Sequence, residues 1–168
     1  YKSIALGDHA DAHGRKSISI GANSEASGNF STATGTDSTA SGRRSTALGH
    51  YSKATGDYSA ALGDSSTASG KYSTAVGQKS QATKLNSTAL GRNSMATHSN
   101  SAAIGANAKT TRANQMSFGT SMNTYTFSGI NSDASRAAQG KIVGVITTDA
   151  EGNLASDGGA LQNQVDSN

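Results

Sequence analysis

Residues 45–58 have the sequence Ser-Thr-Ala-Leu-Gly-His-Tyr-Ser-Lys-Ala-Thr-Gly-Asp-Tyr, which is two consecutive heptads of the form Ser-x-Ala-x-Gly-x-x. The same heptad divides residues 3–121 into seventeen units without an insertion. The exceptions are Ala10, Ala108 and Gln115 at the first position, Ser19, Thr110 and Ser117 at the third, and Lys84, His98 and Arg112 at the fifth. A repeat kept in register over this length predicts a stacked repeat architecture.

The composition excludes a conventional globular core. Only 33% of the 168 residues are apolar, 5% are aromatic and Trp is absent, so composition alone would favour disorder. The strict period argues against disorder. Cys is absent, which excludes disulfides and thiolate metal sites. No apolar run is long enough to span a membrane, so we expect any membrane anchor to lie outside this chain.

The heptad predicts a strand and a turn. A coiled coil also repeats every seven residues, but it needs apolar a and d positions and good helix formers. Here each unit holds Ser and a recurrent Gly, which are poor helix formers, and its central Ala is too small to supply an apolar seam. We expect five extended residues, with Gly adopting a positive φ to reverse the chain.

The fourth position of the heptad reveals a longer period of fourteen residues. In odd-numbered heptads it is Leu6, Ile20, Thr34, Leu48, Leu62, Val76, Leu90, Ile104 and Phe118. In even-numbered heptads it is His13, Ser27, Ser41, Thr55, Ser69, Thr83, Thr97 and Thr111. Because side chains alternate along a strand, the Ser, Ala and Gly positions face inward. The sequence therefore predicts an all-β solenoid, a parallel β-roll of fourteen-residue coils that is very thin.

The odd-numbered strands carry an outward-facing aliphatic stripe. Its members, which we predict to form the subunit interface, are Ile4, Leu6, Ile18, Ile20, Leu48, Leu62, Val76, Leu90, Ile104 and Phe118. A roll with such small residues inside gains little from apolar burial unless the stripe is covered, since one covered Leu contributes about 1.5–3 kcal/mol. Closed homo-oligomerisation around the stripe is the simplest way to cover it.

Several copies of the repeat resemble the Asn-Ser-Val-Ala-Ile-Gly motif of YadA-like heads of trimeric autotransporter adhesins. The runs are Lys2-Ser3-Ile4-Ala5-Leu6-Gly7, Lys16-Ser17-Ile18-Ser19-Ile20-Gly21, Asn86-Ser87-Thr88-Ala89-Leu90-Gly91 and Asn100-Ser101-Ala102-Ala103-Ile104-Gly105. The resemblance implies a left-handed parallel β-roll and a homotrimer joined along the aliphatic strands. It also implies display at the outer membrane of a Gram-negative bacterium, on a coiled-coil stalk with a separate anchor. Adhesion to host matrix or host cells is the implied function, and collagen is the ligand in the best-known member.

The repeat ends near residue 121, and three segments are expected. Residues 1–121 form the head, residues 122–154 a head-to-stalk connector with β-strands and a short helical turn, and residues 155–168 a flexible segment or the start of a coiled-coil stalk. The helical turn is predicted around residues 132–140, with Ser132 or Asp133 at its beginning and Gly140 at its end. Leu154, Leu161 and Val165 fall at heptad spacing.

The turns that end the even-numbered heptads form the candidate ligand site. Stacking places their seventh residues in one column, where basic and aromatic residues interleave. The candidates are Arg15, Lys16, Phe30, Arg43, Arg44, Tyr58, Lys71, Tyr72, Asn86 and Asn100. Charge, stacking and cation–π contacts would suit sulfated glycans or acidic host proteins. The alternative is that these turn residues are merely solvated.

Other functions fit the sequence less well. His9 and His13 lie on different heptads without a third ligand, so no metal site and no cofactor is predicted. No Ser-His-Asp arrangement stands out, and an acyltransferase helix would need a six-residue period, so we expect no enzyme. Residues 1–121 carry 12 Lys and Arg against 6 Asp and Glu, which is modest for a nucleic-acid binder. A structural spacer remains open, as does an ice-binding solenoid, although Asp11, Glu25 and Lys53 interrupt its Thr ladder.

Overall fold

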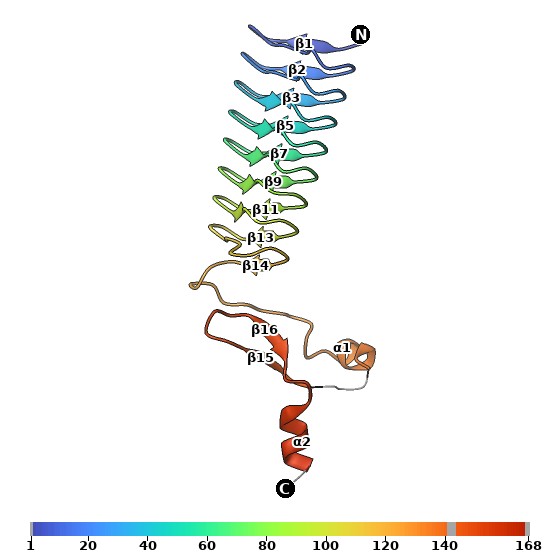
Figure 1. Cartoon of the computed structure of the whole chain (residues 1–168), viewed down its shortest axis with the longest axis vertical. Coiled ribbons are helices and arrows are strands. Elements are labelled where there is room, and N and C mark those ends of the chain that lie inside the picture. Colours follow the sequence, from blue (N-terminus) through green and yellow to red (C-terminus); the bar gives the residue numbers. More distant parts are fainter. Residues whose placement is uncertain (1, 141–143, 167–168) are drawn as a thin grey trace. The chain divides into compact units, whose positions relative to one another are not determined.

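The computed structural model describes residues 2–140 and 144–166 and divides the chain into two compact units, 1–123 and 124–168. The first unit is a regular stack of coils (Figure 1), and the central coils have one strand on either side. Successive coils repeat every fourteen residues, as the sequence predicts: Leu48 pairs with Leu62, and Leu62 with Val76. The all-β solenoid is therefore confirmed.

One face of the stack is a parallel sheet of nine strands from the odd-numbered heptads. Its strands are β1 (Ile4–Leu6), β2 (Ile18–Ile20), β3 (Thr32–Thr34), β5 (Thr46–Leu48), β7 (Ala60–Leu62), β9 (Thr74–Val76), β11 (Thr88–Leu90), β13 (Ala102–Ile104) and β14 (Met116–Phe118). Each strand pairs only with its neighbours in the stack, so the sheet grows by one strand per coil.

The opposite face is a second parallel sheet, of five short strands from the even-numbered heptads. Its strands are β4 (Thr39–Ala40), β6 (Lys53–Ala54), β8 (Thr67–Ala68), β10 (Gln81–Ala82) and β12 (Met95–Ala96). Isolated bridges continue the same pairing at both ends, from Asp11 through Glu25 to Thr39 and from Met95 to Lys109. Both faces therefore follow the fourteen-residue register.

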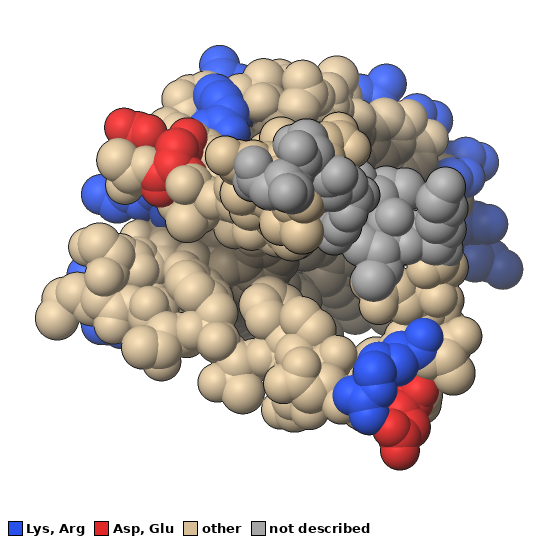
Figure 2. Space-filling view, turned by 90° about the horizontal axis from the view of Figure 1, so that it is seen from below, with Lys and Arg blue, Asp and Glu red and all other residues tan. Residues whose placement is uncertain are grey.

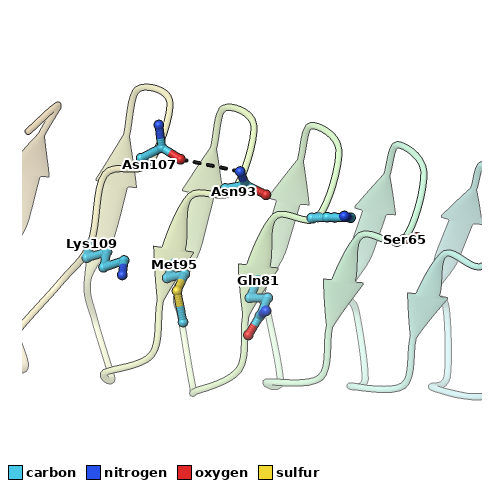
Figure 3. Close-up of a pocket in the computed structure, with 7 residues that line it drawn as sticks. Ser65, Gln81, Asn93, Met95, Asn107 and Lys109 are labelled. Carbon is cyan, nitrogen blue, oxygen red and sulfur yellow. Dashed lines mark hydrogen bonds between the residues drawn. The ribbon is translucent and has the colours of Figure 1, made fainter.

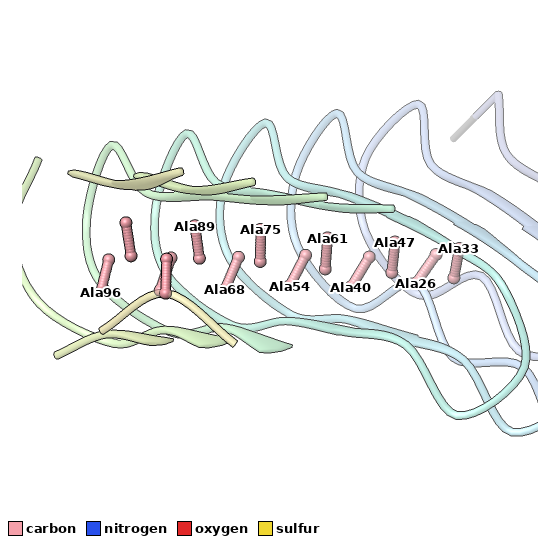
Figure 4. Close-up of a cluster of buried hydrophobic side chains, with 13 residues drawn as sticks. Ala26, Ala33, Ala40, Ala47, Ala54, Ala61, Ala68, Ala75, Ala89 and Ala96 are labelled. Carbon is pink, nitrogen blue, oxygen red and sulfur yellow. The ribbon is translucent and has the colours of Figure 1, made fainter. Parts of the chain in front are cut away.

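The interior between the two sheets is filled by alanine. The thirteen alanines from Ala26 to Ala108 that form the core have no exposed surface, and alternate members come from opposite sheets (Figure 4). A column of serines is buried beside them, and many of its hydroxyls donate to a carbonyl three residues earlier, as Ser52 does to Gly49 at 2.8 Å. This bond removes the cost of burying the hydroxyl. The small side chains make the roll thin, as expected.

The turns differ from the prediction. A left-handed residue does occur in the turns of the first sixteen heptads, but it is the seventh residue of the heptad, with φ from 51° in His9 to 61° in Phe30 and Asn107. The fifth-position glycines have positive φ only in odd-numbered heptads, such as Gly49 at 132°. The expectation that Gly reverses the chain in every heptad was therefore wrong for the even-numbered ones. There, Gly is needed for space: a Cβ on Gly42 would lie 2.0 Å from the Gly56 oxygen.

The second unit contains a short helix, a hairpin and a second helix. Helix α1 (Asp133–Ala138) begins as predicted at Ser132, whose hydroxyl accepts from the Ser135 amide at 3.0 Å, but its C-cap is Gln139 rather than Gly140. Strands β15 (Ile146–Thr148) and β16 (Leu154–Ser156) pair antiparallel, and β16 extends across residue 154, where the connector was expected to end. Residues 141–143 of the expected connector lie outside the described residues.

Helix α2 (Ala160–Asp166) carries two of the three residues that the sequence placed at heptad spacing. Leu161 and Val165 lie on this helix, but Leu154 lies in β16. The heptad spacing of Leu154 therefore does not reflect a continuous helix. Over the described part of the chain, the search for a helix with the length and hydrophobicity of a membrane span finds none.

Candidate functional site: the basic edge and the aliphatic face

The turns that end the first five coils form one continuous edge of the roll, which we call the basic edge. It consists of the residue pairs 15–16, 29–30, 43–44, 57–58 and 71–72. The backbone fixes their stacking, because the Tyr58 amide donates to the Arg43 carbonyl oxygen at 2.8 Å and the same bond recurs in each coil. Side chains add to it: Asp57 Oδ1 accepts from the Arg43 amide at 2.9 Å. The predicted column is thus brought together on a rigid scaffold.

Cations and aromatic rings interlock along this edge. The guanidinium carbon of Arg15 lies 4.7 Å from the Phe30 ring centroid, and that of Arg44 lies 5.6 Å from it. The guanidinium carbon of Arg43 lies 4.8 Å from the Tyr58 ring centroid. These distances are within the range of favourable cation–π contacts. Three further ring contacts are Lys16 over Phe30 at 5.8 Å, Arg44 over Tyr58 at 5.7 Å and Lys71 over Tyr72 at 5.0 Å.

Two tyrosines continue the ladder from coil to coil. The rings of Tyr58 and Tyr72 stack with centroids 5.1 Å apart and planes 24° from parallel. The Tyr72 side chain is half exposed, so the stack presents an aromatic surface to solvent. Stacking holds the rings in place without removing them from water, which suits a binding surface better than a buried core.

The two edges of the upper coils have opposite charge. On the basic edge, five Lys and Arg residues stand against the single acid Asp57, which lies 3.9 Å from Arg43 Nε. The opposite turns, which we call the acidic edge, are the pairs 8–9, 22–23, 36–37, 50–51 and 64–65. These pairs carry Asp8, Asp37 and Asp64 and no Lys or Arg. The contrast is hidden in the charge of the whole repeat, which sums the two edges.

Histidines accompany the acids. On the acidic edge, His50 Nδ1 lies 3.0 Å from Asp64 Oδ2, and this hydrogen bond is the largest of the causes that hold the pKa of Asp64 below its ordinary value. His9 pairs with Asp8 at 3.1 Å, and His13, on the neighbouring strand, pairs with Asp11 at 2.6 Å, all with exposed side chains. Among the described residues, no three His, Cys, Asp or Glu side chains gather in a way that could hold a metal ion.

Below the fifth coil the same column changes character. Asn86 donates to Asn100 at 3.0 Å, and Asn100 donates to Asn114 at 3.2 Å, so the side-chain amides form a ladder. The predicted candidates Asn86 and Asn100 therefore lie in the same column as the basic residues, but their amides are used in bonds between coils. The cation–aromatic ladder itself ends at Tyr72.

The aliphatic stripe lies on the outer face of the nine-stranded sheet. Leu48, Leu90 and Phe118 expose 49%, 45% and 52% of their surface. Ile4 and Leu6 are more exposed still, while Ile18, Leu62, Val76 and Ile104 are partly buried by their neighbours in the stack. Ile20, at 36%, is on the border between these groups. The stripe faces outward, as its period predicts, and is interrupted only at β3, where Thr32 and Thr34 occupy the outward positions.

Comparison with known proteins agrees with this architecture. The family model described as the YadA head domain repeat (2 copies) matches residues 12–38, 26–52, 40–66, 54–80, 68–94 and 82–108. These overlapping matches cover more than half of the chain. The chain belongs to the YadA head family. No curated protein sequence matches it.

A solved YadA structure is similar over nearly the whole chain. It is the collagen-binding domain of the Yersinia adhesin YadA, with 25% sequence identity and a TM-score of 0.65. The alignment covers 99% of this chain and 98% of that domain. The similarity therefore includes the segment after the repeat, and the resemblance drawn from the hexapeptide motifs is confirmed.

The lower coils of the YadA-type head also have a concave surface. A pocket lies between the second sheet and the turns of the odd-numbered heptads, where Gln81, Met95 and Lys109 line one side and Asn93 and Asn107 the other (Figure 3). Asn93 donates to Asn107 at 3.3 Å across neighbouring coils. The residues that line it are mixed in character, without the convergent charge found on the basic edge. The basic edge therefore remains the better candidate site.

Proposed function

We propose that this chain is the ligand-binding head of a bacterial surface adhesin, which attaches a Gram-negative cell to host extracellular matrix or host cells. The observation that carries the proposal is the similarity, over nearly the full length of both chains, to a YadA domain that binds collagen. The family match to YadA head repeats supports the same assignment. The role is binding rather than catalysis, with no cofactor.

The functional unit is a homotrimer closed around the aliphatic stripe. A stripe that leaves about half of Leu48, Leu90 and Phe118 in water is a large apolar surface for a stable monomer. Covering each such side chain contributes about 1.5–3 kcal/mol, and the stripe repeats in most of the nine strands of the sheet. Cyclic symmetry keeps equal coils at equal height, so each stripe meets its equivalent.

The place of action is the bacterial cell surface. The head is exposed at the outer membrane. Its interior of alanine and serine and its dense ladder of backbone hydrogen bonds support this role, because they make a rigid support for surface side chains.

The proposal is tested by adhesion of purified head to immobilised collagen, fibronectin and laminin, and to cultured cells. We expect saturable binding to at least one matrix protein and competition with bacteria that display the full adhesin. A head that binds none of them, while bacteria lacking only this segment adhere normally, would instead make it a spacer for another adhesive domain.

A further inference from the structure

We propose that the basic edge is a binding site for a linear sulfated polysaccharide, which lies along the stack and contacts the first five coils. This inference rests on the proposed role as an adhesin head and names a ligand class and a site for it. It commits to sulfated glycans over the acidic proteins that the same charge would also attract.

The even spacing of the cations along the basic edge supports a linear ligand. Arg15 and Lys16 end the first coil, Arg43 and Arg44 the third, and Lys71 the fifth. Basic groups therefore recur every second coil, about 10 Å apart at the usual spacing of strands. A straight row of evenly spaced cations matches a stiff polyanion whose charges also repeat along a line. A folded acidic protein presents its carboxylates over a curved surface and would reach fewer of them.

The aromatic rings of the basic edge support a carbohydrate ligand. Phe30 and Tyr58 fill the coils between the cationic ones, and Tyr72 stacks on Tyr58. Flat exposed rings are suited to the C–H faces of sugar rings. The guanidinium groups of Arg15 and Arg43 lie over these rings, at 4.7 Å and 4.8 Å from the centroids. A guanidinium that stacks by its face can still direct N–H groups to sulfate or carboxylate oxygens, although Arg43 Nε also lies 3.9 Å from Asp57 Oδ2.

The backbone conformation of the basic-edge turns also supports the proposal. Phe30, Arg44, Tyr58 and Tyr72 have φ between 57° and 61°, a left-handed conformation that disfavours bulky side chains and favours Asn. Asn does occupy the equivalent positions at Asn86, Asn100 and Asn114, where it forms the amide ladder. The upper coils therefore hold large basic and aromatic residues where Asn would give a more stable turn. Tyr51 and Lys79 share this conformation outside the basic edge, so the strain supports a role other than stability only together with the clustering of cations and rings.

The charge contrast between the two edges supports binding along the basic edge alone. The acidic edge of the same five coils holds Asp8, Asp37 and Asp64, so it repels a polyanion that the basic edge attracts. Figure 2 shows Lys and Arg side chains at several separate places on the visible face, most of which is uncharged. Binding along one edge is therefore favoured over a diffuse layer of anionic chains.

The test uses the intact head and two pairs of matched variants. Arg43→Ala with Arg44→Asn removes two cations from the basic edge, and its control, Lys53→Ala with Lys79→Asn, removes two elsewhere, one of them also from a left-handed turn. Tyr58→Asn with Tyr72→Asn removes the aromatic stack, and Tyr51→Asn is its control on the acidic edge. Probes are a heparin decasaccharide, the same oligosaccharide chemically desulfated, and polyglutamate of equal charge, with affinities measured by titration calorimetry.

The inference predicts that the parent head binds the sulfated decasaccharide at least tenfold more tightly than either other probe. The arginine variant should lose at least tenfold in affinity and the tyrosine variant about fivefold, while both controls stay within twofold. Because Asn suits the left-handed turns, the tyrosine variant should melt at the parent's temperature or above. If such a variant loses affinity but keeps the parent's melting temperature, the loss comes from the binding site and not from unfolding.

Four results would overturn the inference: no binding of the sulfated probe, equal binding of polyglutamate, equal losses in the controls, or dissociation of the oligomer by the arginine variant. The last would make the basic edge a contact between copies of the chain. Adhesion to collagen and to cells is measured on the same variants. If the parent head ignores the glycan but still adheres, only this inference fails, whereas loss of every interaction removes the adhesin role as well.

Discussion

The α-carbon of Gly42 faces the carbonyl oxygen of Gly56 in the next coil so closely that a Cβ on residue 42 would lie 2.0 Å from that oxygen. The distance between coils is set by backbone hydrogen bonds, such as Gly42 N–H to the Ala54 oxygen at 3.3 Å, so the coils cannot separate without losing them. We expect Gly42→Ala to destabilise the roll by at least about 2 kcal/mol. Thermal unfolding followed by circular dichroism measures this.

Gly129→Ala is the control, because no atom lies within 4 Å of a Cβ built there. An unchanged melting temperature for both variants would contradict the steric argument. Lys84 shows how the roll accommodates a side chain at this position: its amide donates instead to Ser87 Oγ at 3.2 Å. A local change of this kind limits the damage in the lower coils.

The register of the roll could be read from the sequence because Ser, Ala and Gly recur at the first, third and fifth positions. The alternation of Leu48 with Thr55 separates the two faces, and Thr34 is the one polar residue at the fourth position of the odd-numbered heptads. The turn conformation could not be read in the same way. Position seven holds Phe30, Arg44 and Tyr58 as well as Asn, so composition hides the left-handed backbone that all of them share.

Strand β7 offers a direct test of the alanine core. Ala61 has no exposed surface, whereas Ala60, its neighbour in the strand, faces outward. We expect Ala61→Val to cost about 1–3 kcal/mol, because the extra methyl groups must separate two closely packed sheets. Ala60→Val should be close to neutral, because Val suits an outward strand position. Equal melting temperatures for the two variants would show that the interior has room that the structure does not indicate.

The side-chain amide of Asn100 contributes to both the ladder and the turn. It accepts from Asn86 and donates to Asn114, and its φ is 53°. Asn100→Ala removes both contributions and should lower the free energy of unfolding by about 1–2 kcal/mol. Asn100→Gly removes only the ladder and should cost less, since Gly accepts this φ. Chemical denaturation of the two variants separates the contribution of the amide ladder from that of the turn. If Asn100→Gly were less stable than Asn100→Ala, Asn100 would not have these two roles.

Leu62 tests the oligomer. It occupies the fourth position of an odd-numbered heptad on the aliphatic face, and Thr55 occupies the same position on the polar face. We expect Leu62→Asp or Leu90→Asp to give unfolded monomer, because the seam would bury an unpaired charge. Thr55→Asp should remain a folded trimer. Analytical ultracentrifugation with circular dichroism measures both properties, and a well-folded Leu62→Asp monomer would show that the roll is stable without its partners.

The second unit was the least predictable part of the chain, because its sequence has no repeat in which the same residue preference recurs. Ser132 was readable as a helix start because a hydroxyl there can accept an amide hydrogen. Leu154 was assigned to a helical spacing by its distance from Leu161, although the intervening turn at Gly158 and Gly159 has positive φ. Three apolar residues cannot by themselves separate a heptad from a strand followed by a helix.

Asp157 ties that segment together. Its carboxylate accepts from the amides of Gly159 and Val145, both at 2.9 Å, and from Leu161 at 3.1 Å, so it joins the hairpin to the start of α2. These bonds, with Gly159 first, hold the pKa of Asp157 below its ordinary value of 3.8. The carboxylate is therefore the form that stabilises the fold.

A group whose folded pKa is lowered contributes stability above its ordinary pKa and loses it as the pH falls through the lowered value. We expect the amides of Val145, Gly159 and Leu161 to lose protection from hydrogen exchange as the pH drops below about 4. Asp157→Asn should show reduced protection already at neutral pH, because an amide has one acceptor oxygen in place of two. Glu151→Gln, which removes a carboxylate from the same unit, is the control and should keep the parent's protection and acid response. If Asp157→Asn instead followed the parent's profile, the carboxylate would not be what joins the hairpin to α2.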